Sequence, residues 1–337
     1  MKNKCGIYGG YDEKDDDDTL AAFALLVAGC QQPVVGGPST PSTGSGTGAV
    51  VITLGGPSTS SGTGSAAVAE PVEARTVVPT APAGAGGDYA TLADAIAASS
   101  AGTADNPFVI NVTGNLDIAA VLTIASGKHI KLVSTSGTTL KRLGTAASAL
   151  FFVQSGGSLT IGSGVTVDGN KGAVNASGSL VYVNGGAFTL EAGATLKDNA
   201  NGGFPGGGGG VFVQGGTFTM KGGAISGNSA GNGGGVYVAG GSFIMQGGAI
   251  SGNSTNTFGG GVCVDNSGTF TLEGGTVYGS TAGGGLANTA DYGGAALYKA
   301  GFGTAVFGAN GGSVGGDPRV GGSAIDTTNE TLVGAGA

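Results

Sequence analysis

The chain lacks several residue types that would point to common kinds of functional site. It has no tryptophan, and its single histidine, His129, has no cysteine or histidine close by in the sequence to complete a zinc site. Its cysteines, Cys5, Cys30 and Cys263, are far apart and odd in number, so they indicate no disulfide framework. Lysine and arginine total 13 residues against 21 acidic ones, unlike the basic stripe of nucleic-acid-binding proteins. No metal, cofactor or nucleic acid is therefore expected as a partner.

Glycine, in contrast, accounts for 75 of the 337 residues. Collagen needs a strict Gly-X-Y period with abundant proline, and this chain has 10 prolines and no such period. Hydrophobic residues make up 40% of the chain, which is enough to fill a long, thin core. The glycines are therefore interpreted as corner residues between strands, where the positive φ that glycine adopts easily is needed.

Four similar stretches begin at Val181, Val211, Val236 and Val262. The second, VFVQGGTFTMKGGAISGN, returns 25 residues later as VYVAGGSFIMQGGAISGN. A unit of 25 to 30 residues with three short strand-like pieces cannot bury its apolar side alone, so it must stack on copies of itself. The repeat predicts an all-β fold, a single-stranded parallel β-solenoid in which each coil contributes three short strands.

Aligned repeats place equivalent apolar residues in three columns that should form the core. The first column is Phe151, Val181, Val211, Val236 and Val262. The second is Leu159, Phe188, Phe218, Phe243 and Phe270. The third is Val167, Leu196, Ile225, Ile250 and Val277. Stacked about 4.8 Å apart, these side chains should form ladders along the rod.

A fourth column is polar and consists of Asn170, Asn199, Asn228, Asn253 and then Ser280. Asparagine tolerates a left-handed backbone at a corner, and its amide can bond to the asparagines of the coils above and below. We therefore expect a structural asparagine ladder. The alternative interpretation is a polar row that binds a ligand.

The ends of the repeat region define the expected domain. Residues 91–94, Thr-Leu-Ala-Asp, fit a capping box, and residues 91–99 are predicted to form an amphipathic helix that caps the open end of the solenoid. The first strands are expected at residues 108–112, 121–124 and 130–133. After Gly283 the repeat weakens, with poorer coils at 293–298 and 304–307. The solenoid with its cap should span residues 87–325, followed by a tail at 326–337.

The amino terminus has the features of an export signal. Residues 20–29 form a short apolar run, too short to span a bilayer, and Val27-Ala-Gly-Cys30 resembles the lipobox of bacterial lipoproteins. That resemblance implies that residues 1–30 are a signal region, that Cys30 is acylated, and that Gln31 directs export to the outer membrane. The acidic stretch at 11–18 departs from a usual signal, and an unprocessed apolar patch is the alternative. Residues 31–86, rich in Gly, Ser, Thr and Pro, are predicted to be a disordered, flexible linker.

The repeat also resembles a known family of solenoids. Gly-Gly-Gly-Val-Tyr-Val at 233–238 and Gly-Gly-Ala-Ile-Ser-Gly-Asn at 247–253 are similar to the arrays of bacterial surface lipoproteins with right-handed parallel β-helix repeats of the pectin-lyase-like superfamily. The resemblance implies a right-handed parallel β-helix. Such repeats are specific for a fold and not for an activity.

The resemblance raises the question of an active site, because pectin-lyase-like enzymes cut acidic polysaccharides with clusters of carboxylates. The outward positions after the second and third apolar columns do not place two or three carboxylates on adjacent coils. Asp168 with Lys197, and Glu191 with Lys221, are instead expected to form exposed pairs between coils. No catalytic residue is therefore predicted. A polysaccharide lyase or hydrolase that depends on Asp168 or Asp198 remains the alternative.

Two further surface features are candidate binding sites. Tyr182, Phe212 and Tyr237 share one outward column with Cys263, and such an exposed stripe can stack on sugars. Stacking of these rings on one another is the alternative. Thr-x-Thr pairs at 217–219 and 269–271, with Ser-x-Thr at 158–160, resemble the ladders of β-solenoid antifreeze proteins, so ice binding is a second alternative function.

Together these features predict a non-catalytic, lipid-anchored β-helix at the bacterial cell surface or outer membrane. Its role would be adhesion or contact with an extracellular glycan or host-surface ligand. The membrane would be contacted through the lipid anchor only.

Overall fold

The computed structural model describes residues 49–54, 77–79, 91–99, 102–143, 149–174, 178–202, 207–307 and 312–315, together with short strands at 319–320, 323–324 and 331–333. The predicted signal region and Cys30 lie outside the described residues, so acylation stays a prediction. Within the described residues no helix is long and apolar enough to span a membrane.

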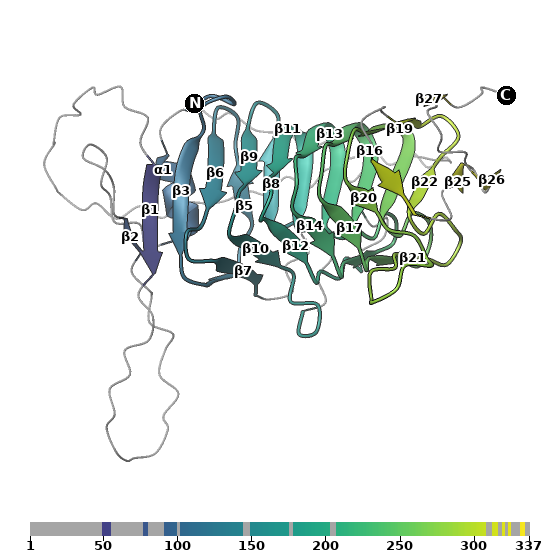
Figure 1. Ribbon diagram of the computed structural model, residues 1–337. Coiled ribbons are helices and arrows are strands. Elements are labelled where there is room, and N and C mark those ends of the chain that lie inside the picture. The colour runs from purple at the N-terminus through teal and green to yellow at the C-terminus, as the bar shows by residue number, and fades with distance from the viewer. Residues whose placement is uncertain are drawn as a thin grey trace, which may run out of the picture. The chain divides into compact units, whose positions relative to one another are not determined.

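The described chain coils into a parallel β-solenoid, which confirms the predicted all-β fold (Figure 1). The path of the largest sheet contains β2 (Val77–Pro79), β1 (Ala49–Leu54), β3 (Phe108–Thr113), β6 (His129–Val133), β9 (Ser158–Ile161), β11 (Val181–Leu190), β13 (Val211–Met220), β16 (Val236–Met245), β19 (Val262–Leu272), β22 (Leu297–Lys299), β25 (Arg319–Val320) and β26 (Ser323–Ala324). Beside this path lie β5 (Leu122–Ile124), β8 (Phe151–Gln154), β23 (Thr304–Phe307) and β27 (Thr331–Val333).

Two smaller sheets form the other sides of the coil. One contains β24 (Ser313–Val314), β20 (Thr276–Val277), β17 (Ala249–Ser251), β14 (Ala224–Ser226), β12 (Thr195–Lys197), β10 (Val165–Asp168), β7 (Thr138–Arg142) and β4 (Leu116–Ile118). The other contains β15 (Ser229–Ala230), β18 (Ser254–Thr255) and β21 (Thr289–Ala290). Among the described strands, antiparallel pairing occurs only where β2 joins β1, β27 joins β23 and β26 joins β25.

The three predicted apolar columns are in register. Val211 pairs with Val236, Phe218 with Phe243, and Ile225 with Ile250 on successive coils. The ring centroids of Phe218 and Phe243 lie 4.5 Å apart with nearly parallel planes, and both rings are fully buried. Successive coils therefore bury one another's apolar residues, as the repeat requires.

The amino-terminal end of the solenoid carries the predicted helix, α1 (Leu92–Ala98). The Thr91 side chain accepts a hydrogen bond from the Asp94 backbone N–H at 3.1 Å, which is the predicted N-cap. Leu92 and Ile96 are buried against the solenoid. The Lys128 ammonium donates to the Ala97 carbonyl at 2.8 Å, so it binds the carboxyl end of the helix, where a cation is favoured.

The predicted flexible linker at 31–86 is wrong for two short segments. Residues 49–54 form β1, which pairs in parallel with β3, and residues 77–79 form β2 on its other side. The sequence AVVITL at 49–54 is rich in β-branched residues, and β3 offers an edge of backbone donors and acceptors. The linker was predicted from the composition of all its residues together, and this average does not reveal a six-residue strand.

The predicted weaker coils at 293–298 and 304–307 contain the short strands β22 and β23. Within the predicted tail at 326–337, β27 pairs antiparallel with β23. Antiparallel addition gives the last coil's edge a partner and does not extend the coil. This placement explains why the repeat pattern gives no signal there.

Candidate functional site

Four asparagines meet at one corner of successive coils and form what is called here the asparagine ladder: Asn199, Asn228, Asn253 and Asn288. The side-chain Nδ2 of Asn228 donates to Asn253 Oδ1, and that of Asn253 donates to Asn288 Oδ1, both at 3.1 Å. All four residues have no exposed surface. A ligand cannot reach such amides, so their geometry supports the structural interpretation over the ligand-binding one.

Ser280, expected as the next member of this column, is exposed, and Asn288 takes its place. The chain inserts residues 278–287 after β20 before it returns to the corner. This insertion shifts the asparagine in sequence but not in space.

Of the two reasons proposed for asparagine at this corner, the bonds between amides of successive coils are present, but the left-handed backbone is wrong for three of the four predicted residues. The left-handed residue is the one before Asn199, Asn228 and Asn253, namely Asp198 with φ 52°, Gly227 with φ 68° and Gly252 with φ 63°. The asparagines instead satisfy backbone carbonyls at the corner. Asn228 Nδ2, for example, donates to the Leu196 carbonyl at 3.2 Å. Hydrogen bonding, and not backbone strain, selects asparagine here.

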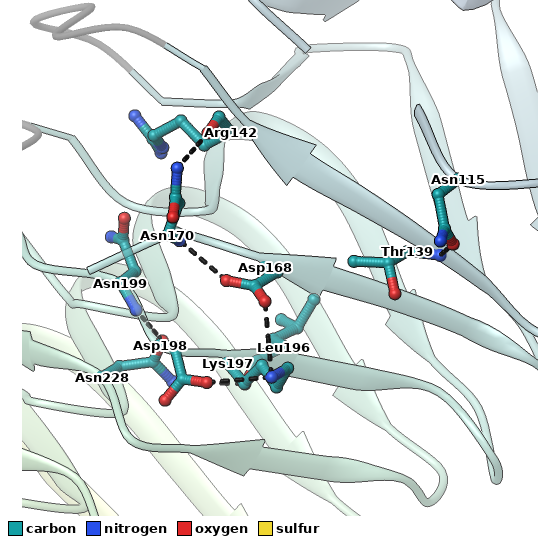
Figure 2. A network of polar contacts seen from close by, with 10 residues as sticks. All are labelled: Asn115, Thr139, Arg142, Asp168, Asn170, Leu196, Lys197, Asp198, Asn199 and Asn228. Carbon is teal, nitrogen blue, oxygen red and sulfur yellow. Dashed lines mark hydrogen bonds and ion pairs between the residues drawn. The ribbon is translucent and has the colours of Figure 1, made fainter. Parts of the chain in front are cut away.

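Asn170 does not join the ladder. Its own φ is 56°, its backbone N–H donates to Asp168 Oδ1 at 2.7 Å, and its Nδ2 donates to the Arg142 carbonyl at 3.2 Å (Figure 2). Gly169 lies against Asn199 so closely that a Cβ at residue 169 would be 2.4 Å from the Asn199 Cα. Asn199 Oδ1 has no hydrogen-bond partner among the described residues. The ladder therefore stops between these two coils.

A shallow, open hollow of about 400 Å³ lies where the ladder stops. This Asp168 hollow is lined by Lys141, Asp168, Asn170, Lys171, Gly172 and Asp198. Strand pairing places Lys141 of β7 beside Asp168 of β10, which in turn lies beside Lys197 of β12. The lining residues thus come from three successive coils and the turns after their strands.

The backbone around the hollow is unusual. Asn170 and Asp198 are the two residues other than glycine that have positive φ in the described part of the chain, and both line the hollow. Asparagine and aspartate adopt this conformation more readily than most residues with a side chain. At the Asp198 position it recurs as Gly227 and Gly252 of the following coils, so it belongs to the corner turn of the repeat.

Lys197 joins the two carboxylates of the site. Its ammonium lies 3.3 Å from Asp168 Oδ2 and 2.9 Å from Asp198 Oδ2 (Figure 2). The hydrogen bond to Asp198 is the main cause that raises the pKa of Lys197, although burial opposes it. Lys197 therefore stays protonated at neutral pH and cannot act as a general base there.

The Asp168–Lys197 pair was predicted, whereas the predicted pair of Glu191 with Lys221 is wrong. Glu191 binds the ammonium of Lys131 at 2.8 Å. The coil between them has Gly162, which carries no side chain to block the path, and a Cβ there would lie 3.1 Å from Glu191 Oε2. Side chains can therefore pair across two coils where the middle one has a glycine.

The remaining cations of the hollow are open to a ligand. Within the described residues the Lys141 ammonium forms no hydrogen bond or ion pair, and the one bond of the Lys171 ammonium is to the Gly227 carbonyl at 3.3 Å. Arg142 follows Lys141 but is buried, where it donates to the Ser179 carbonyl at 2.8 Å and burial lowers its pKa to about 10. In the described part of the chain no three His, Cys, Asp or Glu residues are grouped to hold a metal ion. The hollow offers ammonium donors and carboxylate acceptors to a polar ligand.

The predicted aromatic binding column is present but its ring faces are occupied. The rings of Tyr182 and Phe212 stack at 4.9 Å, and those of Phe212 and Tyr237 at 5.4 Å. The three residues are half-buried, and Gly207 lies against the Phe212 ring. A sugar ring packs on an aromatic face, and here one ring covers the face of the next. The column therefore presents edges only.

Two members of the same column are held or covered by neighbouring residues. The Tyr237 hydroxyl donates to Asp265 Oδ2 at 2.7 Å, and burial together with this bond raises its pKa. Cys263, expected to be exposed, is only 4% exposed, and burial raises the pKa of its thiol to about 12. The backbone of Gly259 covers Cys263, since a Cβ at Gly259 would lie 2.6 Å from the Cys263 Cβ.

The Thr-x-Thr pairs lie in register on the second half of the long strands. Thr217 pairs with Ser242 and Ser242 with Thr269, but Thr219 is followed by Ile244 before Thr271. The hydroxyl array is therefore continuous on one column and interrupted on the other.

Comparisons of the chain with protein-family models, with curated proteins and with solved structures find no match in any of the three. The parallel β-solenoid and the geometry of its surface are thus the basis for a functional proposal.

Proposed function

We propose that the protein is a non-catalytic, right-handed β-helix of the pectin-lyase-like type, lipid-anchored through Cys30 at the bacterial surface, that contacts extracellular glycan. The observation that carries this proposal is the Asp168 hollow, where charged and amide side chains lie open to solvent. Elsewhere at the same corner the polar side chains of the asparagine ladder are buried and bonded to one another.

The position of the hollow on stacked strands suits recognition. Lys141 and Asp168 belong to paired strands, and Asp198 follows the third. Groups held by a rigid sheet lose little freedom when a ligand binds, which favours affinity. Hydroxyl-rich glycans can accept from the lysines and donate to the carboxylates.

Binding without cleavage is supported by the pairing of the charges. Both carboxylates share the ammonium of Lys197, whose raised pKa keeps it charged. Glycoside hydrolysis needs one carboxyl group as an acid and another as a base or nucleophile. A charged lysine bound to both carboxylates favours the ionised form of each, so neither is suited to act as the acid.

A glycan-array screen of the full chain tests the proposal. Glycans that bind would then be titrated by biolayer interferometry against the double variant Lys141→Met/Lys171→Met. We expect affinity to fall at least tenfold, while the control Lys221→Met, an exposed lysine outside the hollow, binds as the wild type does. Unchanged binding by the double variant would reject the hollow as the contact site.

The enzymatic alternative is tested on polygalacturonate with Ca²⁺. Product release that disappears in Asp168→Asn or Asp198→Asn would overturn the non-catalytic proposal. Anchoring is tested separately, by metabolic labelling with an alkyne fatty acid, which should label the wild type but not Cys30→Ser.

Ice binding is the second candidate, favoured by the register of Thr217 and Thr269 with Ser242 between them. The interruption at Ile244 weakens it. Thermal hysteresis at micromolar protein would support this function, and its absence would exclude it.

A further inference from the structure

The aromatic column changes character beyond Cys263. Cys263 pairs in register with Tyr298 of the next coil, so a small side chain stands where the preceding coils have a ring. Phe258, from the turn before β19, stacks on Tyr298 with centroids 4.3 Å apart and planes at 23°. The turn thus supplies the ring that the strand lacks.

A second ring continues this group outward. Tyr292 lies 5.8 Å from Phe258 with its plane tilted by 44°, and it is 69% exposed. The tilt matters, because a tilted ring leaves a face that its neighbour does not cover. Among the described residues no ring stacks in parallel on Tyr292, whereas Tyr182 and Phe212 are half-buried and stack on one another.

The exposure of Tyr292 is held by its backbone. The Tyr292 N–H donates to the Thr257 carbonyl at 2.9 Å, and the preceding strand β21 pairs in parallel with β18. Phe258 also forms a β-bridge with Gly293. A backbone fixed on both sides of the ring keeps the side chain near the surface, and such a ring meets a ligand at low entropic cost.

Size and charge indicate the ligand. One exposed ring supported by two half-buried rings is far smaller than the roughly 800 Å² per partner of a stable protein interface. Its area matches a single pyranose, whose C–H face packs on an aromatic ring while its hydroxyls need acceptors. Asp291, adjacent in sequence to Tyr292, is exposed, and Asp265 is close enough to Tyr298 that its negative charge, after burial and Cys263, helps to raise the pKa of Tyr298. Negative charge favours a neutral sugar over an acidic one.

We propose that Tyr292, supported by Phe258 and Tyr298, is a stacking site for a sugar ring of a neutral, linear glycan. This inference rests on the proposed function of glycan contact but uses a surface separate from the residues of the Asp168 hollow. It adds a subsite that selects for uncharged sugars, whereas the hollow selects for polar groups that lysine can bind.

Isothermal titration of the full chain with β-1,4-linked hexamers of glucose and of N-acetylglucosamine tests it. We expect at least one hexamer to bind, Tyr292→Ala to weaken that binding at least tenfold, and Tyr292→Phe to stay within threefold, because the ring face is kept. The control Phe302→Ala removes another aromatic residue, 67% exposed, from the turn after β22, and should bind as the wild type does.

The outcomes separate this inference from the proposed function. Failure of both hexamers to bind at millimolar concentration overturns the stacking site, as does equal binding by wild type and Tyr292→Ala. If either of these two hexamer results is obtained and the variant Lys141→Met/Lys171→Met no longer binds the glycans found on the array, the hollow is the glycan site and Tyr292 is rejected. Loss in Tyr292→Ala, with unchanged binding by the lysine variant, supports the stacking site and rejects the hollow.

Discussion

One corner of the coil is built in two ways along the rod. From Asn199 to Asn288 it is sealed, because each asparagine bonds to the next and none is exposed. One coil earlier, at Asn170, the same corner is open and charged. Repetition of one residue type builds the scaffold, and the coil where the repetition stops has the surface chemistry.

The largest effect that separates the two regions should come from Asn228→Leu. This change removes two side-chain donor bonds and leaves the Asn199 N–H without its acceptor in a fully buried place. Since each orphaned buried group costs about 1 to 3 kcal/mol, we expect a loss of about 4 kcal/mol. Urea denaturation measures it. A loss below 1 kcal/mol would mean that the ladder does not stabilise the rod.

Burial of Cys263 in the aromatic column also predicts sensitivity to alkali. The thiol of Cys263 has a pKa of about 12 in the folded protein, raised from 9.0 by burial first and by nearby Asp265 second. The stability due to the neutral thiol is complete below pH 9 and is lost as the pH rises toward 12. The loss is about 1.4 kcal/mol per pH unit, or 2 to 3 kcal/mol by pH 11.

Cys263→Ala is the control, because alanine cannot ionise. Chemical denaturation at pH 8 and pH 11 should show the difference in unfolding free energy between wild type and this variant shrinking by that amount. A difference that stays constant between the two pH values would show that the thiol is not buried as described.

At the open corner Asn170→Gly should have a small effect. Glycine adopts φ near 56° without strain, which offsets the lost bond from Nδ2 to the Arg142 carbonyl and the greater freedom of the unfolded chain. We expect a change within about 1 kcal/mol by urea denaturation, against the large loss for Asn228→Leu. Comparable losses at the two positions would erase the distinction between the corners.

Lys197→Met should change stability least. The Lys197 side chain is 36% exposed, and such exposed pairs contribute at most about 1 kcal/mol. The variant leaves Asp168 and Asp198 without their shared cation. Its small loss of unfolding free energy, measured by urea denaturation, should therefore disappear in 1 M NaCl, where charges are screened. A loss of unfolding free energy that does not depend on salt would mean that Lys197 stabilises the protein by packing and not by charge.

How far the sequence predicts each region follows from the repeat. Phe218, Phe243 and Ile225 could be placed because their coils differ in length by few residues and keep one spacing. Asn288 could not, because the insertion at 278–287 breaks that spacing. The strand at 49–54 was missed because its partner β3 lies more than fifty residues away.

The candidate sites were predicted less well than the core. Asp168 and Lys197 were paired correctly, but the contact of Lys197 with Asp198 was not predicted, because the equivalent residues of the next two coils are Gly227 and Gly252, which carry no charge. Tyr292 left a usable signal. Tyr-Gly-Gly at 292–294 repeats the pattern of Phe-Gly-Gly at 258–260, which places the two rings at one corner of successive coils.

Native-state hydrogen exchange of three backbone amides tests the contrast between the corners most directly. The N–H groups of Asn228 and Asn253 donate to buried ladder oxygens, whereas that of Asn170 donates to the partly exposed Asp168. We expect the first two to exchange only on global unfolding and the third to exchange faster by at least two orders of magnitude. Equal protection of all three amides would contradict a ladder that is sealed on one side and open at Asn170.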